Sequence, residues 1–438
     1  MERRLLNTSQ TFTPEAIAAI QESAELGRYS IRGFGAFRNV PRLDDLVFLT
    51  ATLTRFPLEG YRERCETRTV LGTRFARKPL ELSVPITVAG MSFGALSRTA
   101  KVALGRAASL VGTSTTTGDG GMLAAEREAS AKLVYQCLPS RYGFSPADLK
   151  KADAIEIVVG QGAKPGGGGL LLGQKVNQVV AGMRTLPEGV DQRSPCRHPD
   201  WIGPDDLRIK IEELREATDW EIPIYVKLGA TRVTDDVKLA VKAGADVIVL
   251  DGMEGGTAAT QSTFQDHVGI PTLPAIVLAV EALKDMDMLG EVQLVVSGGI
   301  RSGADVAKAL ALGADAVSLG TATLVAMGCN KPIYVEDYEK LGTAPYHCHH
   351  CHTGLCPVGI ATQDEALMAR LDVDQATTHV ANYLQTLVME AQSLARACGK
   401  SDVHNLERED LVALTLEASA MARVPLAGTQ WVVGQNPL

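Results

Sequence analysis

The feature that most constrains the fold is a pattern repeated through the middle of the chain: a short apolar run, a Gly-rich turn and a helix. Several runs are apolar throughout rather than alternating, as strands buried on both faces of a parallel sheet require. The eight runs span residues 84–92, 110–118, 131–138, 154–162, 222–229, 245–252, 292–299 and 315–322. Eight strands, mostly followed by helices, over about 240 residues match the usual size of an α/β protein with a (β/α)8 TIM barrel. An open, doubly wound sheet is the alternative.

The segments on either side of the repeat give the expected domain organisation. We expect an N-terminal extension over 1–80, the barrel over 81–328, a cysteine-rich loop after strand eight over 329–365, and a C-terminal helical segment over 366–438. Helices are predicted at 14–26 in the extension, and at 364–371, 377–398 and 408–419 after the barrel. Residues 162–205 form a long insertion after strand four. So long a loop in a compact domain is usually functional, and this one follows a strand at the catalytic face of a barrel.

Composition and charge exclude several classes of protein. The formal net charge is -8 and no long basic run is present, so nucleic acid is not an expected partner. No run reaches the roughly 18 apolar residues of a membrane span, and the first residues lack the apolar core of a secretory signal. Cysteines clustered in an unsecreted chain usually bind metal and do not form a disulfide framework. We therefore expect the protein to lie in a reducing cytoplasm.

Two adjacent Gly-rich turns close the barrel, at 297–303 after strand seven and at 319–322 after strand eight. In barrels these two loops commonly bind phosphate, because backbone N–H groups and a helix N-terminus converge there. Gly298, Gly299 and Gly303 allow close approach of the chain, and Arg301 is near enough to add charge. Simple tight turns between strand and helix are the alternative, but the position of both turns favours a phosphate-bearing ligand.

Lys227 ends strand five and is expected to point into the mouth of the barrel. A flavin that accepts a hydride develops negative charge, which a nearby cation stabilises. A lysine that forms a Schiff base is the alternative. No dinucleotide-binding fingerprint of the Rossmann type is present, so FMN is the single ligand that the pattern favours.

Four of the eight cysteines lie between residues 329 and 356. Cys348, Cys351 and Cys356 are separated by two and then four residues, and Pro357 follows directly. Thiolates at short spacing before a proline are typical of iron–sulfur ligation. A zinc site of these cysteines with His347, His349, His350 or His352 is equally compatible with the pattern.

Six motifs, taken in order, resemble the FMN-binding barrel domain of glutamate synthases. They lie at 90–97 ("GMSFGALS"), 116–121, 161–169 ("QGAKPGGGG"), 251–259, 297–317 and 351–364, and the resemblance covers about residues 80 to 370. It implies FMN, an iron–sulfur cluster and reduction by the flavin of an imine derived from 2-oxoglutarate. It favours the cluster over zinc and makes 329–365 an iron–sulfur loop.

The resemblance also assigns roles to individual residues. Gln161 and Lys164 would contact the substrate's carboxylates and, with Lys227, act in catalysis. Cys329, Cys351 and Cys356 would hold a 3Fe-4S cluster, and Cys348 would make 4Fe-4S possible. An insertion of 21 residues separates Cys329 from Cys351. The flavin ring would be lined by Gly90, Met91, Ser92, Thr116, Gln136 and Lys227, and its phosphate held by Gly255, Gly256, Gly298, Gly299, Gly320 and Thr321.

Three positions depart from the family's substrate pocket. Thr99 and Gly167 stand where the family has glutamate, and Leu170 where it has glutamine. A less polar pocket suits a substrate with an extra methyl group. The preferred function is therefore the redox subunit of an N-methylglutamate synthase, which converts glutamate and methylamine to N-methylglutamate and ammonia. The alternative is an archaeal-type glutamate synthase that uses 2-oxoglutarate and ammonia from glutamine.

In this family the barrel works with an amidotransferase-like domain and a Gly-rich β domain. We therefore expect two such partner subunits in a hetero-oligomer, because the chain contains no recognisable glutaminase nucleophile. An assembly subunit without turnover and a stand-alone FMN oxidoreductase are the rival hypotheses. His198 and Asp200 are expected to be exposed and inert, and Asp251 to be either catalytic or a cap.

Overall fold

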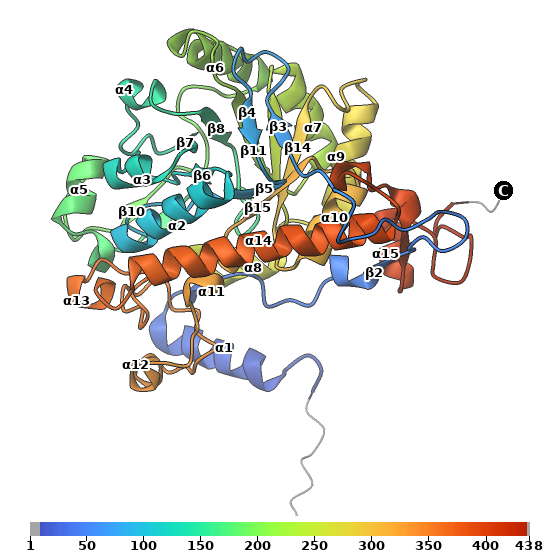
Figure 1. The fold of residues 1–438 in the computed structure, drawn as a ribbon. Coiled ribbons are helices and arrows are strands. Elements are labelled where there is room, and N and C mark those ends of the chain that lie inside the picture. The colour runs from blue at the N-terminus through green and yellow to red at the C-terminus, as the bar shows by residue number, and fades with distance from the viewer. Residues whose placement is uncertain (1–8, 436–438) are drawn as a thin grey trace, which may run out of the picture.

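Eight parallel strands form the centre of the molecule, in the hydrogen-bonded order β5-β15-β14-β12-β11-β8-β7-β6 (Figure 1). The computed structural model describes residues 9–435. The strands are β5 (Ile86–Val88), β6 (Thr115–Thr116), β7 (Leu133–Cys137), β8 (Ala154–Val158), β11 (Ile224–Gly229), β12 (Val247–Asp251), β14 (Gln293–Ser297) and β15 (Ala316–Leu319). Each lies within one of the eight predicted runs. Between β5 and β6, Val88 N donates to Ser114 O at 2.9 Å, which brings the sheet close to a closed barrel. The prediction of a TIM barrel is confirmed.

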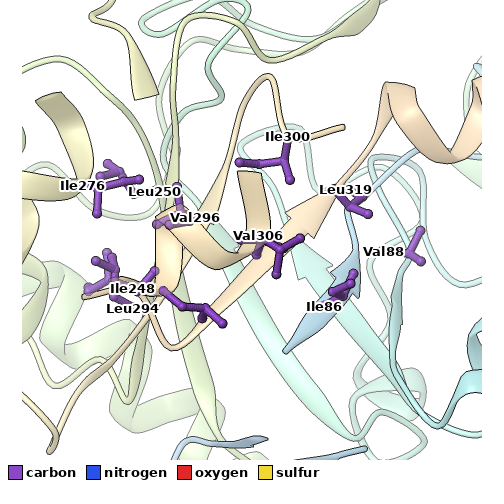
Figure 2. Packing of buried hydrophobic residues seen from close by; sticks show 14 of the residues in the cluster. Ile86, Val88, Ile248, Leu250, Ile276, Leu294, Val296, Ile300, Val306 and Leu319 are labelled. Carbon is purple, nitrogen blue, oxygen red and sulfur yellow. The ribbon is translucent and has the colours of Figure 1, made fainter. Parts of the chain in front are cut away.

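Helices cover the outside of the barrel and bury the outward-facing strand residues. Figure 2 shows this packing between β12 and β14 and helices α9 and α10, where Leu250, Val296, Ile276 and Val306 come together. Continuous apolar strands are needed here because their inward faces are buried as well. The helices that follow the strands are α2 (Arg98–Val111), α3 (Ala124–Ala129), α4 (Pro146–Leu149), α6 (Pro204–Ala217), α7 (Val233–Lys242), α9 (Thr272–Lys284), α10 (Gly303–Ala311) and α11 (Thr321–Met327).

A hairpin before the first barrel strand fills the amino-terminal end of the barrel. It consists of β3 (Thr69–Leu71) and β4 (Leu80–Leu82), which pair antiparallel. Leu71, Leu80 and Leu82 pack in one buried cluster with inward-facing strand residues such as Tyr225 and Val249. The hairpin therefore closes the end of the barrel away from the carboxyl ends of the strands.

The long insertion after β8 carries small elements of its own. It contains β9 (Leu170–Leu171) paired with β10 (Gln192–Arg193), a 3-10 turn (Gly173–Lys175) and α5 (Gln178–Arg184). Beside it, β13 (Thr257–Gln261) pairs with β1 (Ile31–Phe34) and leads into α8 (Ser262–His267). Both additions lie after strand carboxyl ends, so they build on the catalytic face.

The C-terminal segment packs along the outside of the barrel. After α12 (Val335–Lys340) and α13 (Glu365–Met368), the long helix α14 (Val373–Ala397) lies against α2 and α10. Short 3-10 turns follow at Val403–Asn405 and Arg408–Asp410, and α15 (Leu416–Ala422) is the last helix among the described residues. The prediction of a helix over 408–419 was wrong in part, because Leu411–Ala413 forms strand β16, which pairs with β2 (Leu46–Phe48) after the turn Leu43–Asp45.

Helix α1 (Pro14–Leu26) matches its predicted range and has no buried residue. It projects from the body of the molecule (Figure 1). Over the described residues, no helix combines the length and apolarity needed to cross a membrane.

Candidate active site

The carboxyl ends of the barrel strands open into a cavity of about 690 Å³. This volume lies within the roughly 300–1,000 Å³ of small-molecule sites. All the residues expected to hold flavin or substrate, except Thr116, line it: Gly90, Met91, Ser92, Gln136, Gln161, Lys164, Lys227, Gly255, Gly256, Gly298, Gly299, Arg301, Gly320 and Thr321. Thr116 is buried, and its carbonyl oxygen accepts a hydrogen bond from Lys101 Nζ at 3.4 Å.

A fixed cation lies where the strands end. Lys227 on β11 is buried, and its Nζ lies 3.8 Å from Asp251 Oδ2 on β12. Asp251 in turn accepts hydrogen bonds from Ser297 Oγ at 2.6 Å and from Gly162 N at 2.8 Å. These bonds hold the carboxylate in place, and the carboxylate holds the lysine at the cavity wall.

Glu156 on β8 is a buried carboxylate that sequence reasoning missed, because it lies inside an apolar run. Its Oε1 accepts a hydrogen bond from Gln136 Nε2 at 2.5 Å. Burial raises the pKa of Glu156, while Lys227 and the bond from Gln136 oppose that rise. Since the amide nitrogen of Gln136 is engaged, its Oε1 is left as an acceptor. A Cβ at Gly90 would lie 2.3 Å from Gln136 Nε2, so only glycine leaves room for this amide.

Glycines form the opposite end of the cavity, after β14 and β15. Gly298 has φ of 106°, and a Cβ there would lie 2.9 Å from Gly252 N. A Cβ at Gly256 would lie 2.3 Å from Thr321 Oγ1. Within the part of the chain that the structure describes, the N–H groups of Gly299, Gly320 and Thr321 have no acceptor. Backbone donors beside a helix N-terminus suit an anionic group such as phosphate.

Helix α10 and Arg301 contribute less to this end than the sequence suggested. Ser302 and Asp305 form a capping box at the start of α10, and Gly303 N donates to Glu390 Oε2 at 2.7 Å. Arg301 forms an ion pair with Asp44, which holds the pKa of that carboxyl below its usual value. Both the helix N-terminus and the arginine are therefore already engaged with carboxylates of this chain.

Two more buried cations lie on the side of the insertion. Lys164 Nζ donates to Thr257 Oγ1 at 3.0 Å and to Ala259 O at 3.2 Å, and burial lowers its pKa to about 8. Arg184, which sequence reasoning missed, lines the cavity while it donates to Phe93 O and Asp119 O. Lys164 and Arg184 therefore place two basic side chains on this side of the cavity.

The three positions that depart from the family pattern differ in their relation to the cavity. Gly167 and Leu170 line it, whereas Thr99 does not. The Thr99 hydroxyl lies 3.0 Å from Ser97 Oγ at the start of α2. Only the two insertion residues therefore reduce the polarity of the cavity itself.

The four clustered cysteines gather at one wall of the same cavity. Cys329 and Cys351 line it. Burial raises the pKa of Cys351 to about 12, and the thiols of Cys356 and Cys348 add to this rise. Burial and the same neighbours, with Cys351, raise the pKa of Cys329 well above its ordinary value. Asn330 joins two of these cysteines, because its Nδ2 donates to Cys329 Sγ at 3.7 Å and to Cys348 O at 3.1 Å.

The arrangement of these cysteines gives no support to a zinc site. Across residues 9–435, no group of three or more His, Cys, Asp or Glu side chains is placed to hold a metal ion. The rings of His349 and His350 stack on each other at 4.5 Å. Zinc needs all its ligands around one atom, whereas an iron–sulfur cluster distributes its cysteines over several irons. Four cysteine thiols match the donor set of an iron–sulfur cluster.

His198 is buried rather than exposed, which corrects the expectation from the sequence. Its Nε2 lies 2.7 Å from Val158 O and its Nδ1 lies 2.9 Å from Arg141 Nη1. Arg141 also pairs with Asp200 at 2.6 Å. His198 therefore fixes the end of the insertion against strand β8, and Asp200 fixes it against Arg141.

Solved structures share the barrel. The chain resembles a variant of flavocytochrome b2 with sulfite bound, with a TM-score of 0.54 and 15% identity over 92% of this chain and 86% of that one. It also resembles a protein described as a lactate oxidase of Pediococcus acidilactici, with a TM-score of 0.53 and 15% identity over 85% and 84% of the two chains. At this identity the likeness shows a common TIM-barrel fold.

Sequence relatives define the family. A profile of the conserved region in glutamate synthase matches residues 39–401. A "glutamate synthase large subunit-like protein" of Rhizobium meliloti is 64% identical over 98% of this chain and 97% of its own. The archaeal-type glutamate synthase of Thermotoga neapolitana and the archaeal glutamate synthase of Methanocaldococcus jannaschii are 36% and 35% identical, each over 90% of this chain and 79% of theirs. This chain belongs to the glutamate synthase family.

Proposed function

We propose that the chain is the FMN- and iron–sulfur-dependent redox subunit of a glutamate-synthase-type complex. The observation that carries this proposal is that Cys329 and Cys351 line the same cavity as Lys227 and the glycine turns. A flavin in that cavity and a cluster on those cysteines would share one wall. The family's members named glutamate synthase support the reaction class.

The residues present fit FMN. The N–H groups of Gly299, Gly320 and Thr321 would bind its phosphate, and Gly90, Met91, Ser92 and Gln136 would lie along its ring. Lys227 would place positive charge beside the ring. When bound, the flavin would supply hydride to the substrate, and the cluster would pass electrons to the flavin.

The chain's own side chains would bind and orient the substrate. Lys164 and Gln161 would hold the two carboxylates of a five-carbon dicarboxylate, because both line the cavity where the insertion begins. The insertion would also exclude water, which protects an imine from hydrolysis. In the cytoplasm, an amidotransferase-like subunit and a Gly-rich β subunit would assemble with the chain. The amine would then reach the cavity through a closed path between the subunits.

N-methylglutamate is the product we prefer, because Gly167 and Leu170 make the cavity less polar than the family pattern. Glutamate made from 2-oxoglutarate is the second candidate, which the names of the archaeal-type relatives favour. The test is the complex reconstituted with both partner subunits, supplied in one arm with glutamate and methylamine and in the other with 2-oxoglutarate, ammonium and an electron donor. Faster formation of N-methylglutamate supports the first candidate, and faster formation of glutamate supports the second. Strong turnover by the isolated chain would contradict the proposal that partners are needed.

A further inference from the structure

A buried lysine connects the insertion to the cysteine loop. Lys175, at the end of the 3-10 turn Gly173–Lys175, is 1% exposed. Its Nζ donates to Ala95 O at 2.7 Å and to Cys351 O at 2.9 Å. A Cβ at Gly354 would lie 3.1 Å from Lys175 Cγ, so the side chain is packed closely against the loop. One ammonium group thus joins three segments of the active-site wall.

The charge of Lys175 has no carboxylate to balance it. Two other buried cations do have such a partner: Lys101 pairs with Glu126 at 2.6 Å, and Arg215 with Asp246 at 2.9 Å. In the part of the chain that the structure describes, Lys175 has two carbonyl oxygens as partners and no salt bridge. A buried charge without a counter-charge is strongly unfavourable, so an anion beside Lys175 would stabilise it. One of those two oxygens belongs to Cys351, so the ammonium group lies directly against the cysteine loop.

Lys164 offers a parallel inside the same protein. It is also buried, with a hydroxyl and a carbonyl oxygen as its partners. Its place on the cavity wall means that a bound dicarboxylate would supply the missing negative charge. By the same reasoning, we expect the anion that balances the charge of Lys175 to lie in the cysteine loop.

We propose that Lys175 is a positioning residue that balances the negative charge of a cysteine-ligated cluster and raises its reduction potential. The inference rests on the proposed function, since it needs a cluster on these cysteines. A reduced cluster carries one more negative charge than an oxidised one. A fixed positive charge beside it therefore favours the reduced form.

The test compares Lys175→Met, Lys175→Arg and the wild type as holoprotein, by potentiometric titration of the cluster followed by electron paramagnetic resonance. Lys175→Met should make reduction at least tenfold less favourable, which is about 59 mV for a one-electron couple. Lys175→Arg keeps the charge and should restore most of the difference. Lys331→Met is the control, because Lys331 is exposed to solvent two residues after Cys329.

Each outcome decides between the two proposals. A wild type without iron would overturn the proposed function and this inference together. A Lys175→Met protein that keeps its cluster at the wild-type potential, or at a higher one, would overturn the inference alone. If Lys175→Met loses its cluster, retention by Lys175→Arg at the wild-type potential supports the role of charge. Equal loss of the cluster in both variants would show that only packing matters and would overturn the inference.

Discussion

Lys227 is surrounded by acidic groups from both neighbouring strands. Asp251 lies 3.8 Å from its Nζ, and Glu156 on the other side is buried and hydrogen-bonded to Gln136. Charge at the floor of the cavity is thus set by one lysine and two carboxylates. Because these residues lie on the three adjacent strands β8, β11 and β12, their spacing is fixed by the barrel and not by a flexible loop.

Glu156→Gln should raise the midpoint potential of the bound flavin. The substitution removes negative charge behind Gln136 and beside Lys227 while it preserves shape, so a reduced flavin is stabilised. A tenfold change in the two-electron equilibrium corresponds to about 30 mV. The measurement is a dye-coupled redox titration, with the exposed residue Glu212 changed to Gln as control. A potential that falls or does not move would contradict the role of Glu156.

Cys351→Ser or Cys356→Ser should remove most of the iron while the protein stays folded. A hydroxyl is a poor ligand for the iron of a cluster, which selects thiolates. Iron and zinc are measured by elemental analysis, and folding by circular dichroism. Cys196→Ser is a matched control, since Cys196 is exposed at the mouth of the cavity and outside the cluster. One zinc and no iron in the wild type would show that the cluster is assigned wrongly.

Residues in recognisable motifs could be predicted from the sequence, and residues that act through other residues could not. Lys227 and the glycines were found because they follow strands at known places in a barrel. Glu156 lies in a run that reads as apolar, and nothing in the sequence shows that it faces the barrel interior at Gln136. Lys175 lies in a polar insertion, where an exposed lysine is the ordinary expectation.

At the scale of elements, the insertion is anchored to the barrel by His198. Its Nε2 donates to Val158 O on β8, which leaves Nδ1 as the acceptor for Arg141. A second proton would have to be placed on Nδ1, against a guanidinium. Burial is the larger cause, and together they lower the pKa of His198 to about 4.

Acid should destabilise the protein through this histidine between about pH 6.5 and 4. In the unfolded chain His198 takes up a proton near pH 6.5, and in the folded chain only near pH 4. Its contribution to the free energy of unfolding is therefore fully present above pH 6.5 and is lost as the pH falls toward 4. The His198→Gln protein should be less stable at neutral pH, but its free energy of unfolding should change less between pH 6.5 and 4. The measurement is urea unfolding at pH 7.5, 5.5 and 4.5 for both proteins. Equal pH dependence in the two would contradict the anchor.

The barrel strands could be predicted because each is a continuous apolar run before a Gly-rich turn. The pairing of β2 with β16 could not, since Leu46–Phe48 and Leu411–Ala413 are short and far apart in the chain. Their strand conformation is imposed by this tertiary contact. Without that contact, the apolar residues 411–413 fit the predicted helix over 408–419.

At the scale of the whole molecule, segments before and after the barrel complete its catalytic face. Strand β1 pairs with β13 at the mouth of the cavity, and Gly33 N donates to His349 O of the cysteine loop at 2.8 Å. Helix α1, just before β1, is different because none of its residues is buried. An isolated helix of 13 residues is marginal in water, so tertiary or partner contacts normally stabilise it.

The proposed complex would supply such a contact, and Ile17 and Ile20 are its expected centre. They are 45% and 56% exposed on α1. The double variant Ile17→Glu, Ile20→Glu should keep the melting temperature and flavin content of the isolated chain, because surface changes usually alter stability by about 0.5 kcal/mol or less. Its affinity for the partner subunits should fall at least tenfold in a titration by surface plasmon resonance. Ile209→Glu is the control: Ile209 is 50% exposed on α6, on the other side of the barrel from α1 (Figure 1). Unchanged affinity in the double variant would place the partner surface elsewhere, and a lower melting temperature would show that α1 is stabilised by its own chain.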